Sequence, residues 1–210
     1  MRTQYPGDIT IESGPLESTG GKVWDASLNF FRFLSDCDEL KNPERMKILE
    51  LGSGCGWLGM RLSKQFVSAS ILMSEQSQFG ALDWLNHNIS LNPGLNLEAV
   101  ELDWAHLPEN VASSRWDFVI GCELVYSYGG ACLLASVLGS LLGHRGSVCF
   151  YAHSLNRFES VDERMFAEFE RNNLCVEVVY GNRDSIANIG SFGELFREIE
   201  LVIFRITKRI

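Results

Sequence analysis

The chain has little proline, no long apolar run and a deficit of positive charge. Only 5 of its 210 residues are proline, and 18 lysines and arginines stand against 27 aspartates and glutamates, for a formal net charge of −9. No stretch approaches the roughly 20 apolar residues that span a bilayer, and Met1–Asp8 lacks the apolar segment of a secretory signal. We therefore expect no membrane insertion and no general attraction to nucleic acid, and a partner that is more basic than the chain itself.

Paired cysteines are also lacking. The six cysteines, at positions 37, 55, 122, 132, 149 and 175, are scattered and include no Cys-x-x-Cys pair. Such a pattern offers neither a zinc site nor a disulfide framework, and it is typical of a reducing compartment. We expect a cytoplasmic protein without a bound metal, with the nucleus as the other compatible compartment.

The composition is that of an ordinary globular protein. Hydrophobic residues make up 46% of the chain and charged residues 21%, and a chain of this length can bury a full-sized core in one domain. Residues 1–22 are rich in Gly, Pro, Ser and Thr and are predicted to form an N-terminal arm, either extended or a weak hairpin. Residues 23–210 are predicted to form a single domain, and we expect a monomer.

Strand-like and helix-like segments alternate along most of the chain. Strands are predicted at 48–51, 70–73, 97–102, 116–122 and 146–152, and helices at 24–36, 57–65, 79–90, 131–142 and 160–171. The last two predicted strands, 175–180 and 199–207, flank a polar insertion without a helix, so they should pair antiparallel. This order predicts an α/β fold, a Rossmann-like, doubly wound, seven-stranded sheet in a three-layer sandwich with an antiparallel C-terminal hairpin.

The most informative segment lies at the end of the first predicted sheet strand and reads Ile48-Leu49-Glu50-Leu51-Gly52-Ser53-Gly54-Cys55-Gly56-Trp57-Leu58-Gly59. Glycines after a buried strand let the backbone pass very close to a ligand. Glu50 decides which ligand, because a negative charge there gains nothing from a pyrophosphate but favours an ammonium and a sulfonium. S-adenosylmethionine (AdoMet) carries both, so Glu50, Gly52, Ser53, Gly54 and Gly56 are predicted to bind it.

Two other interpretations of these glycines are open. The spacing Gly54-x-Gly56-x-x-Gly59 also matches a dinucleotide fingerprint, and Glu75 lies where a ribose-binding acid is expected. A tight strand-to-helix turn that binds no ligand is the third possibility. Glu50 and the antiparallel C-terminal strands both count against a dinucleotide.

Polar and aromatic side chains follow each of the next three predicted strands, at the sheet edge where open α/β folds bind ligands. Glu75 can accept hydrogen bonds from two ribose hydroxyls. Asp103 and Trp104 suit an adenine, whose amine needs an acceptor and whose faces stack on aromatic rings. Glu123 and Tyr126 would face the point at which the methyl group leaves.

Four segments in this order resemble the family 16 branch of the seven-strand, class I AdoMet-dependent methyltransferases, which includes many protein-lysine N-methyltransferases. They are Val23-Trp24-Asp25-Ala26, Glu50-Leu51-Gly52-Ser53-Gly54-Cys55-Gly56, Leu102-Asp103-Trp104 and Glu123-Leu124-Val125-Tyr126. The signature of the family after the fourth strand usually has Asp where this chain has Glu123, whose carboxylate reaches one methylene further.

The resemblance implies an enzyme that transfers methyl groups from AdoMet to a lysine amine of a protein substrate. Trp24 would line the donor pocket together with Cys122, and Glu123 and Tyr126 would form the acceptor side. The C-terminal hairpin and residues 153–157 would border the substrate channel. Other acceptors, namely a histidine, an N-terminal amine or a small molecule, stay open, as does an AdoMet-binding chaperone or scaffold without turnover.

Overall fold

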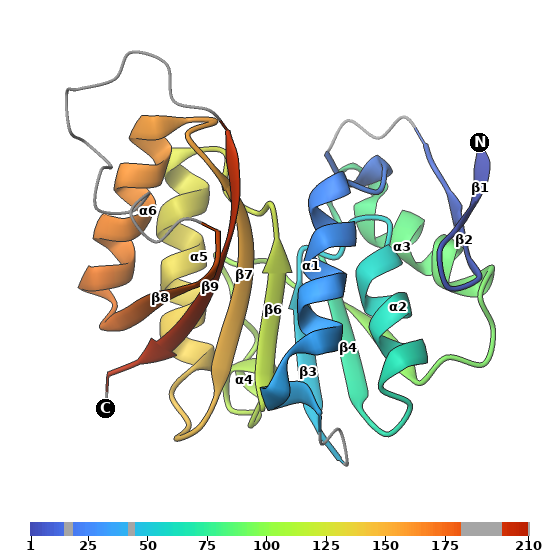
Figure 1. Ribbon diagram of the computed structural model, residues 1–210, viewed down its shortest axis with the longest axis horizontal. Coiled ribbons are helices and arrows are strands. Elements are labelled where there is room, and N and C mark those ends of the chain that lie inside the picture. The colour runs from blue at the N-terminus through green and yellow to red at the C-terminus, as the bar shows by residue number, and fades with distance from the viewer. Residues whose placement is uncertain (15–18, 42–44, 182–198, 210) are drawn as a thin grey trace.

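In the computed structural model, which describes residues 1–14, 19–41, 45–181 and 199–209, one mixed sheet runs through the chain (Figure 1). Its strand order is β5-β4-β3-β6-β7-β9-β8. The strands are β3 (Lys47–Leu51), β4 (Ser70–Glu75), β5 (Leu97–Glu101), β6 (Phe118–Cys122), β7 (Val148–Leu155), β8 (Leu174–Tyr180) and β9 (Glu200–Lys208). The first five are parallel, and β9 pairs antiparallel with both β7 and β8. The predicted seven-stranded fold with its antiparallel ending is confirmed.

Helices cover both faces of this sheet (Figure 1). The helices α1 (Asp25–Asp36), α2 (Trp57–Gln65) and α3 (Ala81–Ser90) pack on one face, and α4 (Glu109–Ala112), α5 (Tyr128–Leu141) and α6 (Glu159–Arg171) on the other. Short 3₁₀ turns occur at η1 (Thr19–Gly21), η2 (Asp38–Leu40) and η3 (Gln78–Gly80). Within the described ranges, no helix is both long and apolar enough to cross a membrane.

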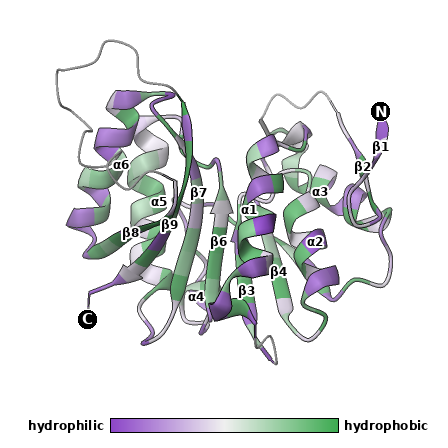
Figure 2. Cartoon of the chain, in the orientation of Figure 1, coloured by the Kyte–Doolittle hydropathy of each residue, from purple (hydrophilic) through white to green (hydrophobic). Residues whose placement is uncertain are grey.

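The core is split by the sheet into two halves because successive strand residues point to opposite faces. Ile48 and Ile120 pack into the half under α1 and α2, whereas Leu49 and Val119 pack into the half under α5 and α6. Both faces are covered, so the parallel strands are nearly continuous apolar runs, as Figure 2 shows for β3, β6 and β7. The strands are thereby held rigidly, with their carboxyl ends at one edge.

Several predicted elements have different ends in the structure, for local reasons. The helix predicted at 131–142 begins at Tyr128, because Ser127 Oγ accepts a hydrogen bond from Gly130 N at 3.1 Å and caps it. The segment 79–90 is interrupted at Phe79 (φ +56°), so α3 begins at Ala81. The strand predicted at 146–152 extends to Leu155 because it pairs with β9 from Cys149 to Leu155.

The remaining differences are small. The helix predicted from 24 begins at Asp25, and the strand predicted from 116 begins at Phe118. Most of the polar insertion between the last two strands, residues 182–198, lies outside the described residues.

The N-terminal arm contains a hairpin of β1 (Arg2–Tyr5) and β2 (Ile9–Glu12) that packs beside α2 and α3. Two asparagines, Asn88 in α3 and Asn92 in the turn after it, supply the backbone of β2 with the hydrogen bonds that a third strand would otherwise make. Asn88 Oδ1 accepts a hydrogen bond from Glu12 N at 2.8 Å, and Asn92 accepts one from Thr10 N and donates one to Thr10 O, both at 2.8 Å. The arm is therefore fastened to the helical layer, and the division of the chain after residue 22 stays a prediction.

Replacement of Asn92 by Ala should lower the free energy of unfolding by about 1–3 kcal/mol, because the Thr10 N–H and carbonyl both lose their partner. Urea denaturation followed by circular dichroism measures the change. Asn29, which is exposed on α1, is the matched control, and Asn29→Ala should alter stability by less than about 0.5 kcal/mol. Equal effects of the two variants would contradict the anchoring role.

Candidate active site

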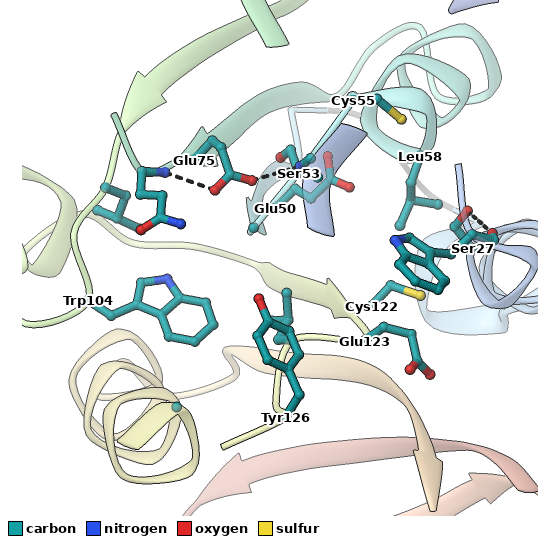
Figure 3. A pocket seen from close by; sticks show the side chains of 18 of the residues that line it. Ser27, Glu50, Ser53, Cys55, Leu58, Glu75, Trp104, Cys122, Glu123 and Tyr126 are labelled. Carbon is teal, nitrogen blue, oxygen red and sulfur yellow. Dashed lines mark hydrogen bonds between the residues drawn. The ribbon is translucent and has the colours of Figure 1, made fainter. Parts of the chain in front are cut away.

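A cavity opens at the carboxyl ends of β3, β4, β5 and β6 (Figure 3). The strand order reverses here, because β4 and β5 lie on one side of β3 and β6 lies on the other, and open α/β sheets bind ligands at such a point. Each of these strands is followed by a loop that contributes to the cavity wall. All but one of the predicted site residues line it, namely Trp24, Glu50, Gly52, Ser53, Gly54, Glu75, Asp103, Trp104, Cys122, Glu123 and Tyr126. Residues from five separate segments of the sequence therefore meet in one place.

The glycine loop after β3 is held open by its neighbours. Ser53 N donates to Ser74 O at 2.9 Å, and Gly54 N donates to Glu75 Oε2 at 2.8 Å, which fixes the loop to the end of β4. Gly54 has φ +54°, and a Cβ there would lie 3.3 Å from the backbone of Gly20. A side chain would be strained at this position and would press against the N-terminal segment that passes over the loop.

Gly56 is the predicted site residue that does not line the cavity. It precedes α2 with φ +87°, and a Cβ at this position would collide with the side chains of Leu85 and Met73. Gly56 therefore faces the core beneath the loop. It allows α2 to begin close to the sheet, which is a structural requirement that the sequence pattern does not separate from ligand contact.

Glu50 is a buried carboxylate in the cavity wall, with only 3% of its surface exposed. Desolvation raises its pKa to about 8, and the nearby Glu75 adds to the rise, while the Ser53 hydroxyl and the Gly59 N–H oppose it. Glu50 Oε2 completes no hydrogen bond with any described residue. Gly59 makes room for this oxygen, since a Cβ there would overlap it. A buried acceptor without a partner suits a ligand that brings a cation or an N–H donor.

Glu75, the last residue of β4, and Asp103, in the loop after β5, both make hydrogen bonds to the chain itself. Glu75 Oε1 and Oε2 accept from Gln76 N at 3.0 Å and Gly54 N at 2.8 Å, and burial raises the pKa of Glu75. Asp103 accepts from Ala105 N at 2.9 Å and contacts His106 Nδ1 at 2.9 Å, and the His106 contact lowers the pKa of Asp103. Each carboxylate oxygen has a second lone pair, so both acids can still accept from a ligand.

The opposite side of the cavity is formed by the loop after β6. Glu123 has φ +55°, and its carboxylate accepts a hydrogen bond from Ser154 Oγ at 2.7 Å and forms an ion pair with Arg157 at 3.0 Å. Tyr126 is 54% exposed at the rim, and in Figure 3 its ring lies between Trp104 and Glu123. The predicted acidic and phenolic groups therefore share this wall, but the acid is already paired within the chain.

The N-terminal segment supplies wall residues that the sequence reasoning missed. Lys22 lies with its Nζ 4.1 Å from the centre of the Trp24 ring, and both residues line the cavity. Gln76, Leu58 and Ser127 also line it. Gln76 and Ser127 are next in sequence to the predicted residues Glu75 and Tyr126, and Leu58 lies in the first turn of α2. Proximity in sequence to the predicted residues was the signal that could have identified these three.

Neither histidine nor thiolate chemistry is suggested by the cavity. His153 is buried outside its wall, with its ring nitrogens 2.9 Å from the Tyr151 hydroxyl and 2.8 Å from Asp162 Oδ1. Burial raises the pKa of the Cys55 thiol to about 11 and that of Cys122 well above its ordinary value, so both stay neutral. Across the described part of the chain, no three His, Cys, Asp or Glu side chains could together hold a metal ion.

The sequence also matches known proteins. The profile of the family described as lysine methyltransferase matches residues 4–172. A mouse protein named EEF1A lysine methyltransferase 3 is 27% identical over 195 residues, covering 91% of this chain and 78% of that protein. A Chaetomium thermophilum protein named protein-lysine N-methyltransferase EFM3 is 27% identical over 187 residues, covering 82% of this chain and 54% of that protein.

Solved structures with low sequence identity share the fold. M. jannaschii TYW2 in complex with AdoMet superposes with a TM-score of 0.60 at 16% identity, covering 98% of this chain and 85% of that one. The precorrin-6y C5,15-methyltransferase from Geobacter metallireducens gives a TM-score of 0.59 at 14% identity, covering 95% and 93%. With the cavity wall and the extent of the family match taken together, the chain belongs to the lysine methyltransferase family and is an AdoMet-dependent protein-lysine methyltransferase.

Proposed function

We propose that the chain methylates a lysine in a basic segment of its protein substrate, with Glu123 and Tyr126 at the acceptor end of the cavity. The observation that carries this proposal is the shared wall, since both residues line the same cavity as Glu50, Glu75 and Trp104. The net charge of −9 supports a basic target, because it favours encounter with positively charged segments.

On the donor side of the cavity, each part of AdoMet would have a residue to bind it. Glu50, buried and with an unsatisfied oxygen, would hold the positively charged methionyl end. Glu75 would accept the ribose hydroxyls, and Asp103 and Trp104 would take the adenine. The AdoMet donor supplies a methyl group on a positively charged sulfur, which is reactive enough that the protein needs chiefly to position it and to exclude water.

The acceptor side must deliver a lysine in its neutral form. A lysine amine has a pKa of about 10.4 in water, and burial beside aromatic rings lowers it. Trp24 and Tyr126 would provide that apolar surface and tolerate the growing methylation through cation–π contact. The amine lone pair forms the N–C bond while the C–S bond breaks, its electrons stay on sulfur, and one proton leaves to water. Alignment alone contributes about 7–11 kcal/mol to such a step.

The relatives suggest the first substrate to test. The mouse protein described above and a Xenopus tropicalis protein, 26% identical over 183 residues, are both named as EEF1A lysine methyltransferases. We propose EEF1A, or a protein with a similarly basic lysine-containing segment, as the substrate. We propose further that the chain acts as a monomer in the cytoplasm.

The substrate is tested by incubating the chain with AdoMet that carries a trideuterated methyl group. Purified EEF1A and a lysate from cells grown with a methylation inhibitor serve as acceptors, followed by mass spectrometry at residue resolution. Label on lysine is the expected result. Label on histidine, on N-terminal amines or on small molecules would assign a different acceptor, and AdoMet binding without any transfer would indicate a scaffold.

The acceptor roles are tested with Tyr126→Phe and Glu123→Gln. Each should lower turnover by about 10- to 100-fold, because positioning of the amine is lost, while the Kd for S-adenosylhomocysteine, which has no positive charge on sulfur, changes by less than about twofold. Tyr180→Phe is the control, since Tyr180 is 51% exposed on β8 and does not line the cavity. Parallel losses of turnover and donor affinity would show that the two residues belong to the donor side.

The role of Glu50 predicts a pH-dependent affinity for AdoMet. Without a ligand, the Glu50 carboxyl has a pKa of about 8 and holds a proton below that pH, whereas a bound cation favours its ionised form. Binding should therefore release a proton, and the affinity should weaken up to about tenfold per pH unit below pH 8. Isothermal titration in buffers of different ionisation enthalpy measures both effects.

Glu50→Gln provides the comparison for this prediction, because it should bind AdoMet weakly and without the pH dependence. Thermal unfolding of the ligand-free variant shows whether it folds. The raised pKa of Glu50 means that its stabilising contribution to the wild type is present at low pH and is lost as the pH rises from about 4.5 to about 8. Ligand-free Glu50→Gln should therefore melt above the wild type at pH 8.5. An affinity of the wild type that is independent of pH would contradict the proposed role.

A further inference from the structure

The carboxylate of Glu123 has both of its oxygens engaged by residues at the end of β7. Oε1 accepts a hydrogen bond from Ser154 Oγ at 2.7 Å, and Oε2 lies 3.0 Å from Arg157 Nη1. The Glu123 side chain is 10% exposed and that of Arg157 is 38% exposed, so the pair is only partly screened by water. Glu123 lines the cavity and Arg157 does not, so the cation stands behind the carboxylate.

The backbone around Glu123 is fixed as firmly as its side chain. Its φ of +55° is in the left-handed region, which a residue with a Cβ rarely adopts. Glu123 N donates to Ala152 O at 2.9 Å, which continues the pairing of β6 with β7 past the end of β6. Such a conformation persists where the surroundings over-determine it, and these contacts together do so.

Two other titratable groups in the described ranges interact with Glu123, and neither carries a charge that could replace Arg157. Cys122 on β6 and Tyr151 on β7 both interact with Glu123, and burial raises the pKa of each group well above its ordinary value. Both are therefore neutral at physiological pH. Among the residues that the structure describes, Arg157 is the cation paired with this carboxylate.

This balance matters for a lysine acceptor. An unpaired carboxylate within about 4–6 Å of an amine stabilises the ammonium form and raises its pKa by 1–3 units. The ammonium has no lone pair, so an unpaired Glu123 would bind the substrate in its unreactive form. A carboxylate paired with Arg157 exerts a much smaller net field, yet its free lone pairs can still accept an N–H bond and orient the amine.

We propose that Arg157 is a positioning residue that neutralises Glu123, so that the acceptor lysine enters the cavity as a free amine. This inference rests on the proposed acceptor role of Glu123. It also gives a physical reason for Glu where the resembling family usually has Asp, because the additional methylene lengthens the reach of the carboxylate toward Arg157.

The test uses sinefungin, a donor analogue that has an amine in place of the transferred methyl group and so puts an ammonium at the reacting position. Isothermal titration gives its Kd and that of S-adenosylhomocysteine, which lacks this amine. In Arg157→Gln, the unpaired Glu123 should attract the ammonium, and the preference for sinefungin over S-adenosylhomocysteine should rise by about tenfold relative to the wild type. An unchanged preference, or equal weakening of both ligands, would overturn the proposal and leave Arg157 a purely structural residue.

Two variants of arginine serve as controls. Arg157→Lys retains the positive charge and should keep the wild-type preference. Arg171→Gln removes an arginine that is ion-paired with Glu168 on α6, away from the cavity, and should also leave the preference unchanged. If Arg157→Gln does not fold, Glu123→Gln is measured instead. There Arg157 is left unpaired, so the preference for sinefungin should fall, and no fall would overturn the proposal.

A second readout uses turnover on the substrate identified with labelled AdoMet. In Arg157→Gln, the pH at which kcat reaches half of its maximum should rise by about one unit, because the freed carboxylate raises the pKa of the bound lysine. A loss of kcat at all pH values without such a shift would contradict the proposal. The sinefungin measurement needs no protein substrate, so failure of lysine transfer and failure of the role of Arg157 are separate results.

Discussion

The burial of the Glu50 carboxylate is the physical constraint on which the ligand preference of the cavity depends. The parallel strands end together on one side of the sheet, and Glu50, the penultimate residue of β3, is buried there next to the glycine loop and α2. A buried carboxylate without a partner is costly, and the ligand-free chain limits this cost by retaining a proton, which is the physical meaning of a pKa of about 8. A cationic ligand removes the same cost by supplying the missing charge. The burial of Glu50 by itself therefore favours a positively charged ligand at this part of the cavity wall.

The rigidity of the sheet brings the other predicted donor-binding residues into the same cavity as Glu50. Glu75 serves two purposes, because its oxygens hold the glycine loop through Gly54 N and remain able to accept from a ligand. The N-terminal segment closes over the loop at Gly20, and the hairpin before it is fastened to α3 by Asn88 and Asn92. Gly14 N donates to Gly21 O at 3.1 Å, which links the end of this hairpin to the segment that carries Trp24. A ligand in this cavity would touch residues that are distant in sequence but held by one packed core.

The parts that could be predicted from the sequence are those with a local physical signature. Periodicity and glycine spacing indicate the strands, the loop and the acids that follow successive strands, and the ends of parallel strands necessarily meet. The orientation of Gly56 could not be predicted, because a glycine required by core packing and one required by a ligand look alike in sequence. Nor could the pairing of Glu123 with Arg157, which are 34 residues apart and meet only because β7 lies beside β6. Contacts of this kind depend on tertiary packing and leave no local pattern.

The two carboxylates Glu50 and Glu123 in the cavity wall are compensated in different ways. In the proposed mechanism this difference suits a methyl transfer, which brings together a cationic donor and a lysine that must lose its proton. One oxygen of Glu50 has no hydrogen-bond partner among the described residues, so in the proposed mechanism its charge is available to the donor. Glu123 is matched by Arg157 within the chain, so in the proposed mechanism its charge is not available to the acceptor. In these proposed roles, Glu50 would attract the donor cation, while the acceptor lysine would gain little from Glu123 by keeping its proton. A site with two free carboxylates would hold both cations tightly and would slow the reaction between them, because the lysine ammonium would have no lone pair to offer.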